Sequence, residues 1–222
     1  MTEPVQELAH QEFRAVVLNP SFACVLGASA VRRGDYSFHS YPRLGSPESA
    51  DTLAINLVAF IEEYPLTPGR YASYIASFRD PGGISATEFE KLLWQTLQQL
   101  HERDNQAWDP SVSADPDDAG FSFSFHGRAF FVVGLHAGSP RWTRRLAFPT
   151  LVFNAHEQFE DLRRSGRFPQ AQRTIRNRDT KLQGSPNPAL AEYGRESEAR
   201  QYGGRLVSSD WQCPFQPTEE QT

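Results

Sequence analysis

Two apolar segments in the middle of the chain each end in a histidine. Residues 129–136 read AFFVVGLH, and residues 149–156 read PTLVFNAH. Neutral imidazole is the commonest side-chain ligand for metal ions, and it also holds haem iron in many proteins. A histidine at the end of a buried strand can face a cavity rather than the core, so His136 and His156 are candidate iron ligands. A hydrogen-bonded structural histidine is the alternative at both positions.

An arginine-rich segment, residues 141–178, begins between these two histidines and continues after the second. It contains no lysine, and arginine is the better residue for fixed, bidentate contacts with carboxylates and phosphates. The combination suits a buried, anionic, iron-bearing ligand. A solvated helix face and a nucleic-acid surface are the alternatives, and the net charge of −5 argues against nucleic acid. The nine arginines are Arg141, Arg144, Arg145, Arg163, Arg164, Arg167, Arg173, Arg176 and Arg178.

The length and composition indicate one globular domain. We expect it to span residues 1–222, with an N-terminal helix at 1–18 and a loose tail at 216–222. No run of about 18 apolar residues is present, which predicts no transmembrane helix. The polar, acidic N-terminus does not resemble a signal peptide, so we expect a cytoplasmic protein. In that reducing compartment Cys24 and Cys213 are expected to be free thiols.

Helices and strands alternate without a regular βαβ rhythm. This pattern predicts an α+β fold, with a mainly antiparallel sheet and flanking helices in a single domain. Residues 121–125 alternate apolar and polar side chains and are expected to form a hairpin with the strand at 128–135. Residues 149–155 are a further buried strand. Residues 40–49 contain proline and glycine and are expected to be a loop.

Two helices have clear start signals. Asp51 is a plausible N-cap for a helix that runs to about residue 63. Thr87 and Glu90 have the spacing of a capping box, which predicts a second helix from Thr87 to about Arg103. Both helices carry an apolar stripe that requires a partner surface. We therefore expect both to pack against the sheet.

Eight short motifs follow one another in a specific order between about residues 20 and 215. In that order they resemble the YqcI/YcgG-like family, with Ala23 where the family has proline and Ser139-Pro140 where it more often has Ser-Ser or Ala-Ser. The motifs are FACV at 22–25, GLHAGSPR at 134–141, RR at 144–145, LVFNAHEQFE at 151–160, IRNRD at 175–179, QGSPNP at 183–188, EARQY at 198–202 and WQCPF at 211–215.

The resemblance implies an enzyme that uses haem. The family includes haem-dependent N-oxygenases that hydroxylate the guanidine of arginine or a cyclic guanidine precursor, and a relative that oxidises an aminoimidazole. It therefore implies a haem b enzyme that transfers oxygen to a nitrogen of a guanidine- or amine-containing small molecule and receives electrons from a donor. The alternative function is a non-catalytic haem carrier or sensor. We expect no nucleic-acid or membrane partner and leave a homodimer open.

The expected iron ligand is His136, with His156 and Cys24 as alternatives. The expected catalytic groups are His156, as a distal acid–base group, and Glu157, as a carboxylate for a guanidinium. Further candidate carboxylates are Glu160, Asp179 and Glu198. The expected cofactor-binding residues besides His136 are Ser139, Arg141, Arg144, Arg145, Phe153 and Asn154.

Overall fold

A five-stranded sheet forms the centre of the computed structural model, which describes residues 3–65, 72–188 and 194–218. The strand order is β1-β2-β5-β4-β3. β1 and β2 pair in parallel and all other neighbours are antiparallel, which confirms the predicted α+β class. The strands are β1 (Tyr36–Arg43), β2 (Ser73–Asp80), β3 (Phe123–Phe125), β4 (Arg128–Leu135) and β5 (Thr150–Ala155).

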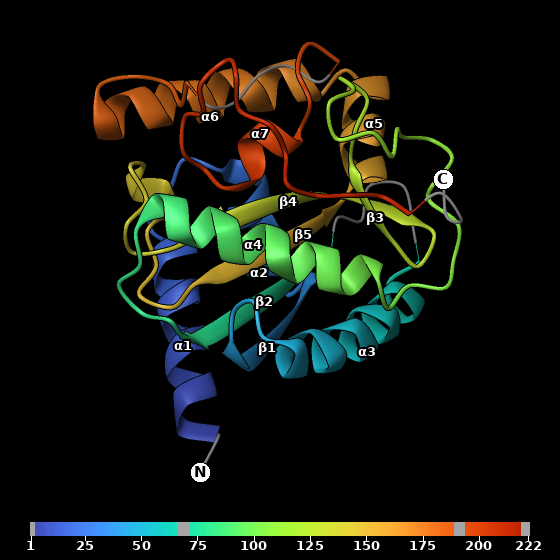
Figure 1. Ribbon diagram of the computed structural model, residues 1–222. Coiled ribbons are helices and arrows are strands. Elements are labelled where there is room, and N and C mark those ends of the chain that lie inside the picture. Colours follow the sequence, from blue (N-terminus) through green and yellow to red (C-terminus); the bar gives the residue numbers. More distant parts are fainter. Residues whose placement is uncertain (1–2, 66–71, 189–193, 219–222) are drawn as a thin grey trace.

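Helices cover both faces of this sheet. α1 (Glu3–Val17) and α2 (Val25–Arg33) lie behind it in Figure 1, and α3 (Pro47–Glu63) and α4 (Ala86–His101) lie in front. Each face has its own apolar core, because strand residues alternate between the two sides. The core on the α3–α4 side includes Leu57, Tyr74, Phe89, Leu97, Phe130, Val132 and Phe153. The core on the α1–α2 side includes Phe13, Val17, Val31, Ile75, Leu135 and Leu146.

The remaining helices gather at one end of the molecule, at the top of Figure 1. They are the 3₁₀ turn η1 (Trp142–Arg144), α5 (His156–Arg164), α6 (Phe168–Gln183) and α7 (Ala199–Tyr202). Residues 216–218 of the expected tail have neither helix nor strand structure, and 219–222 lie outside the described residues. Among the described helices, none combines the length and the apolar content that crossing a membrane requires.

The hairpin between β3 and β4 confirms its prediction. Its two turn residues, His126 and Gly127, have φ angles of 52° and 68°. A two-residue turn with positive φ at both positions matches the right-handed twist of the paired strands. The turn sets the register that pairs Phe123 with Phe130.

Three local predictions were wrong. The expected loop at 40–49 includes the second half of β1, whose parallel pairing with β2 depends on residues 37 positions away. α3 is capped by Ser46, not Asp51, and Pro47 follows at the first helical position, which favours this earlier start. α4 is capped by Ser85, whose Oγ accepts a hydrogen bond from the Glu88 amide at 3.2 Å, in place of the expected box at Thr87.

Candidate functional site

A cavity of about 320 Å³ lies between the sheet and the helices of the α1–α2 side. This volume is at the lower end of the range of small-molecule sites, about 300–1,000 Å³. Most of its lining is apolar. Its floor comes from β2, β4 and β5, and its walls come from α1, α2, α5 and α6. The floor residues are Ser73, Ile75, Phe131, Val133, Leu135, Val152 and Asn154.

Strand alternation decides which residues of β4 reach this cavity. Phe131, Val133 and Leu135 line it. Phe130 and Val132 point to the opposite face and pack in the α3–α4 core. Successive side chains of a strand face opposite sides of the sheet. Because Leu135 faces the cavity, the residue that follows it faces the α3–α4 side.

His136 therefore lies on the other side of the sheet from the cavity. It is fully buried and stacks on Phe89 of α4, with ring centroids 4.2 Å apart. Neither ring nitrogen has a hydrogen-bond partner among the described residues. Burial, reinforced by the positive charge of Arg144, lowers the pKa of His136 to about 4. The imidazole is neutral at physiological pH and does not line the cavity, contrary to its expected position.

Cys24 does line the cavity, at the N-terminus of α2. Its Sγ accepts a hydrogen bond from the Gly27 amide at 3.4 Å. Burial raises the pKa of the Cys24 thiol, whereas the Gly27 and Leu26 amides and the charge of Arg144 act to lower it. A helix N-terminus and a nearby cation both favour a thiolate, the form that binds metals.

Of the three arginines expected to bind the cofactor, Arg141, Arg144 and Arg145, only Arg144 lines the cavity. It is 6% exposed, and its Nη1 donates to the Gln201 carbonyl at 3.0 Å. Among the described residues no carboxylate lies within ion-pair distance of this guanidinium. Burial lowers its pKa to about 10, and the groups of Cys24 and Asp179 oppose this shift. A buried, unpaired guanidinium in a cavity wall is a binding group for an anion.

The neighbouring arginines are engaged elsewhere. Arg141 Nη2 donates to Asp179 Oδ2 at 2.5 Å and to the Ser185 carbonyl at 2.6 Å. Arg145 Nε donates to the Ser139 carbonyl at 2.7 Å. Ser139 itself is fully buried, and its Oγ accepts a 3.3 Å hydrogen bond from the Arg141 amide. These three expected cofactor-binding residues therefore shape the loop before η1 rather than the cavity surface.

Phe153 and Asn154 of β5 point to opposite faces of the sheet, because successive side chains of a strand alternate. Phe153 is fully buried in the α3–α4 core. Asn154 lines the cavity, where its Oδ1 accepts a hydrogen bond from Ser73 Oγ at 2.8 Å. Of this expected pair, only Asn154 can contact a ligand in the cavity.

His156 and Glu157 begin α5, next to the cavity but outside its lining. His156 is 2% exposed, and its Nε2 lies 3.5 Å from Glu160 Oε1. Its Nδ1 lies 3.9 Å from Oε1 of Glu198, which does line the cavity. Burial raises the pKa of Glu157, helped by Asp109. Glu157 Oε2 has no hydrogen-bond partner among the described residues.

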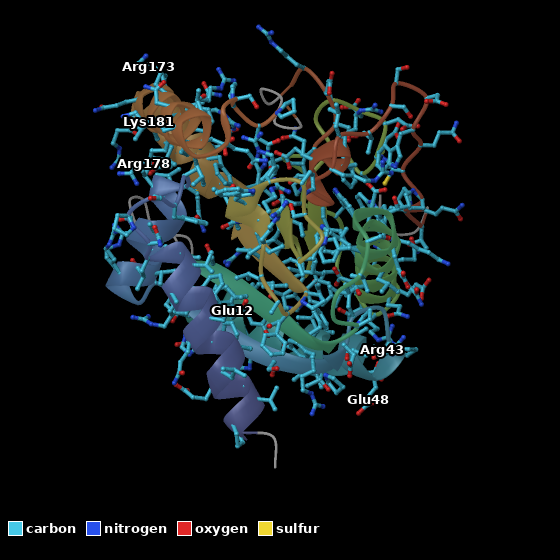
Figure 2. All side chains as sticks on the ribbon, turned by 90° about the vertical axis from the view of Figure 1, so that its left-hand side faces the viewer. Glu12, Arg43, Glu48, Arg173, Arg178 and Lys181 are labelled. Atoms are coloured by element: carbon cyan, nitrogen blue, oxygen red, sulfur yellow. The ribbon has the colours of Figure 1, made fainter. Side chains whose placement is uncertain are left out.

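Much of the remaining arginine-rich segment faces outward. Figure 2 shows Arg173, Arg178 and Lys181 gathered around α6, far from Arg43 and Glu48 at the other end of the molecule. Arg178 is half-buried, and its Nη1 donates to the Phe22 carbonyl at 3.3 Å. It thereby joins α6 to the segment that precedes α2, two elements that border the cavity.

Sequence reasoning did not anticipate that α1 and α2 form a cavity wall. Phe13, Val17 and Phe22 line the cavity together with Cys24. A usable signal was present, because Cys24 directly precedes a helical segment, where a side chain can cap the helix N-terminus. Only the packing of α2 against α6 brings this cap to the cavity.

The fold is that of an α+β domain with a mainly apolar cavity of small-molecule size on one face of its sheet. The chain belongs to the YqcI/YcgG family, whose model matches residues 13–216. Two relatives from Bacillus subtilis (strain 168) are the uncharacterized proteins YcgG and YqcI. YcgG is 29% identical over 210 residues, covering 88% of this chain and 81% of YcgG. YqcI is 29% identical over 206 residues, covering 87% of this chain and 80% of YqcI. No solved structure matches the chain.

Proposed function

We propose that this protein is a haem-dependent N-oxygenase that binds haem b in the cavity and acts on a guanidine- or amine-containing small molecule. One observation carries the proposal: Cys24 lines the same mainly apolar cavity as the buried guanidinium of Arg144, which has no ion-pair partner among the described residues. Haem b needs an apolar site, an axial ligand and cations for its propionates. The donors present in the cavity fit these three needs.

We assign the iron ligand to Cys24 and a propionate contact to Arg144. The α2 N-terminus and the Gly27 amide stabilise negative charge on Sγ. A metal-bound thiol loses its proton outright, which overcomes the effect of burial on the pKa of Cys24. No cluster of three or more metal-binding side chains occurs in the described residues, but one axial side chain is sufficient to hold haem iron.

Asp179 is the proposed contact for the positive charge of the substrate. It lines the cavity, and its Oδ2 is held by Arg141. Its Oδ1 is buried and has no hydrogen-bond partner among the described residues. A guanidinium or protonated amine can donate to this oxygen in a charge-assisted hydrogen bond. Haem b, when bound, supplies the oxygen activation that amino-acid side chains lack. The proposed reaction also requires an electron donor, in keeping with a cytoplasmic location.

The direct test is an absorption spectrum of the protein purified after expression with a haem precursor. We expect a Soret band that Cys24→Ser abolishes or reshapes, and that His136→Phe and the matched control Cys213→Ser leave unchanged. Colourless protein would overturn the proposal. A Soret band altered by His136→Phe and not by Cys24→Ser would instead identify His136 as the iron ligand.

Turnover is tested with arginine, agmatine and related guanidines, in the presence of a reductant and oxygen. Mass spectrometry should detect a product heavier by one oxygen atom. Haem binding without any oxidised product across this panel would instead identify the alternative function, a haem carrier or sensor.

A further inference from the structure

Three ionisable side chains form a line from the protein surface to the cavity. The first is Glu160 of α5, whose side chain is 43% exposed. Its Oε1 lies 3.5 Å from His156 Nε2, and His156 Nδ1 lies 3.9 Å from Glu198 Oε1. His156 and Glu198 are 2% and 5% exposed, and Glu198 lines the cavity. The line therefore begins in solvent and ends at the proposed site of chemistry.

Glu198 is held so that one oxygen remains directed to His156. Its Oε2 accepts hydrogen bonds from Ser122 Oγ at 2.9 Å and from Tyr202 Oη at 3.4 Å. These two donors fix the carboxyl group on the side of β3 and α7. Oε1 is then the oxygen nearest to the histidine. This arrangement gives the two oxygens different roles, one structural and one available for proton exchange.

The charged groups around the line favour a mobile proton. Glu198 faces Arg163, Glu160 and His156, and His156 also faces Asp109. Burial raises the pKa of Glu198 to about 7 and lowers the pKa of His156. Both shifts disfavour the charged forms, so a proton on His156 is driven toward Glu198. Arg163 forms an ion pair with Glu160 and thereby holds the outer carboxyl group beside His156.

We propose that Glu160, His156 and Glu198 form a proton relay that delivers protons from solvent to the cavity. A proton passes from Glu160 to His156 Nε2, and the ring releases its Nδ1 proton to Glu198 Oε1. Glu198 then donates that proton into the cavity. The gaps of 3.5 and 3.9 Å exceed a direct hydrogen bond. A small side-chain rotation closes each of them.

The relay rests on the proposed function for the use of its protons. Hydroxylation of an amine nitrogen by dioxygen consumes one amine, one dioxygen, two electrons and two protons. It yields one hydroxylamine and one water molecule, and the donor is oxidised by two electrons. The lining of the cavity is mainly apolar, and a defined path for protons from solvent serves that reaction.

The competing role of Glu198 is purely structural, as an anchor for Ser122 and Tyr202. Glu198→Gln separates the two roles, because an amide oxygen still accepts from both donors but the group carries no exchangeable acid proton. Glu198→Asp retains the acid and serves as the rescue variant. Glu90→Gln is the matched control, since Glu90 is also buried and bonded, to Arg205, on the other face of the sheet.

The first measurement does not depend on haem. The pKa of His156 is followed by NMR in the full chain labelled with ¹⁵N-histidine, before haem is added. We expect the ring signals of His156 to report the ionisation of Glu198 as a step near pH 7, and Glu198→Gln to remove that step, because an amide does not ionise. We expect Glu90→Gln to leave it unchanged. The same titration of the His156 signals in Glu198→Gln and in wild type would overturn the relay, whether or not the protein binds haem.

The second measurement uses the haem-loaded enzyme. We expect Glu198→Gln and His156→Asn to keep the Soret band while slowing product formation about 100-fold, the scale of a lost general acid. We expect them to release more hydrogen peroxide per electron pair consumed, and Glu198→Asp to restore turnover. Normal turnover and an unchanged pH profile in Glu198→Gln would refute the relay while leaving the oxygenase proposal intact. Absence of haem would refute the oxygenase alone, and the NMR result would still decide the coupling.

Discussion

His136 stacks on Phe89 with ring centroids 4.2 Å apart and an interplanar angle of 17°. The contact buries both rings completely, on the opposite side of the sheet from the cavity. An imidazole without hydrogen-bond partners is tolerated there in its neutral form, because the cost of burying a charge is avoided. This contact makes His136 a determinant of acid stability.

The stability contribution of His136 should disappear at low pH. Its pKa is about 4 in the folded chain and 6.5 in the unfolded chain. The contribution is therefore complete above pH 6.5 and is lost as the pH falls through 4. His136→Phe keeps an aromatic ring and removes the titration. From pH 6.5 to pH 4, the free energy of unfolding of this variant should therefore fall by up to about 3 kcal/mol less than that of wild type. Urea denaturation at a series of pH values measures this, and parallel losses in both proteins would contradict it.

Glu198 should act in the opposite direction. Its pKa rises from 4.5 in the unfolded chain to about 7 in the folded chain. Its contribution to stability is complete below pH 4.5 and is lost as the pH rises through 7. Relative to wild type, Glu198→Gln should become more stable by up to about 3 kcal/mol between pH 4.5 and pH 8. Calorimetric melting temperatures across this range test the sign. A constant difference between the two proteins would rule out the raised pKa.

Arg144 should affect ligand binding more than folding. Arg144→Met removes a buried charge that has no carboxylate partner among the described residues, so we expect the ligand-free chain to lose at most about 1 kcal/mol. Haem affinity should fall about tenfold or more, because a charge-assisted hydrogen bond is lost. Haem titration followed by absorbance gives the affinity. The matched control is Arg145→Met, whose guanidinium lies outside the cavity lining and should leave affinity unchanged.

Gly134 of β4 should not tolerate a side chain. A Cβ at this position would overlap the Phe89 ring and lie 2.8 Å from the Tyr202 carbonyl oxygen. We expect Gly134→Ala to lower the free energy of unfolding by about 1–3 kcal/mol, the usual cost of overpacking a core. Gly82→Ala, where a Cβ meets nothing within 4 Å, is the control and should change stability by less than about 0.5 kcal/mol. Chemical denaturation compares them, and equal losses would contradict the packing argument.

Local patterns in the chain were sufficient for the antiparallel half of the sheet. The alternation at 121–125, the turn at His126-Gly127 and the apolar runs before His136 and His156 correctly predicted β3, β4 and β5. These signals are local, because an antiparallel hairpin is specified by its turn and by side chains close to it. β1 was missed, since a parallel pair is joined by a long connection and gains its stability from a distant strand.

The cavity depended on contacts between distant parts of the chain. The residue types were readable from the start: Cys24, Arg144, Asp179 and Glu198 were all named as candidates. The sequence did not show which candidates would line the cavity. A strand directs neighbours such as Leu135 and His136 to opposite faces, and nothing local indicates which face will contain empty space. That face is chosen when α1, α2, α5 and α6 pack around a gap over the sheet, while α3 and α4 fill the other side. Packing across the whole chain places Cys24 at the cavity and His136 in the core.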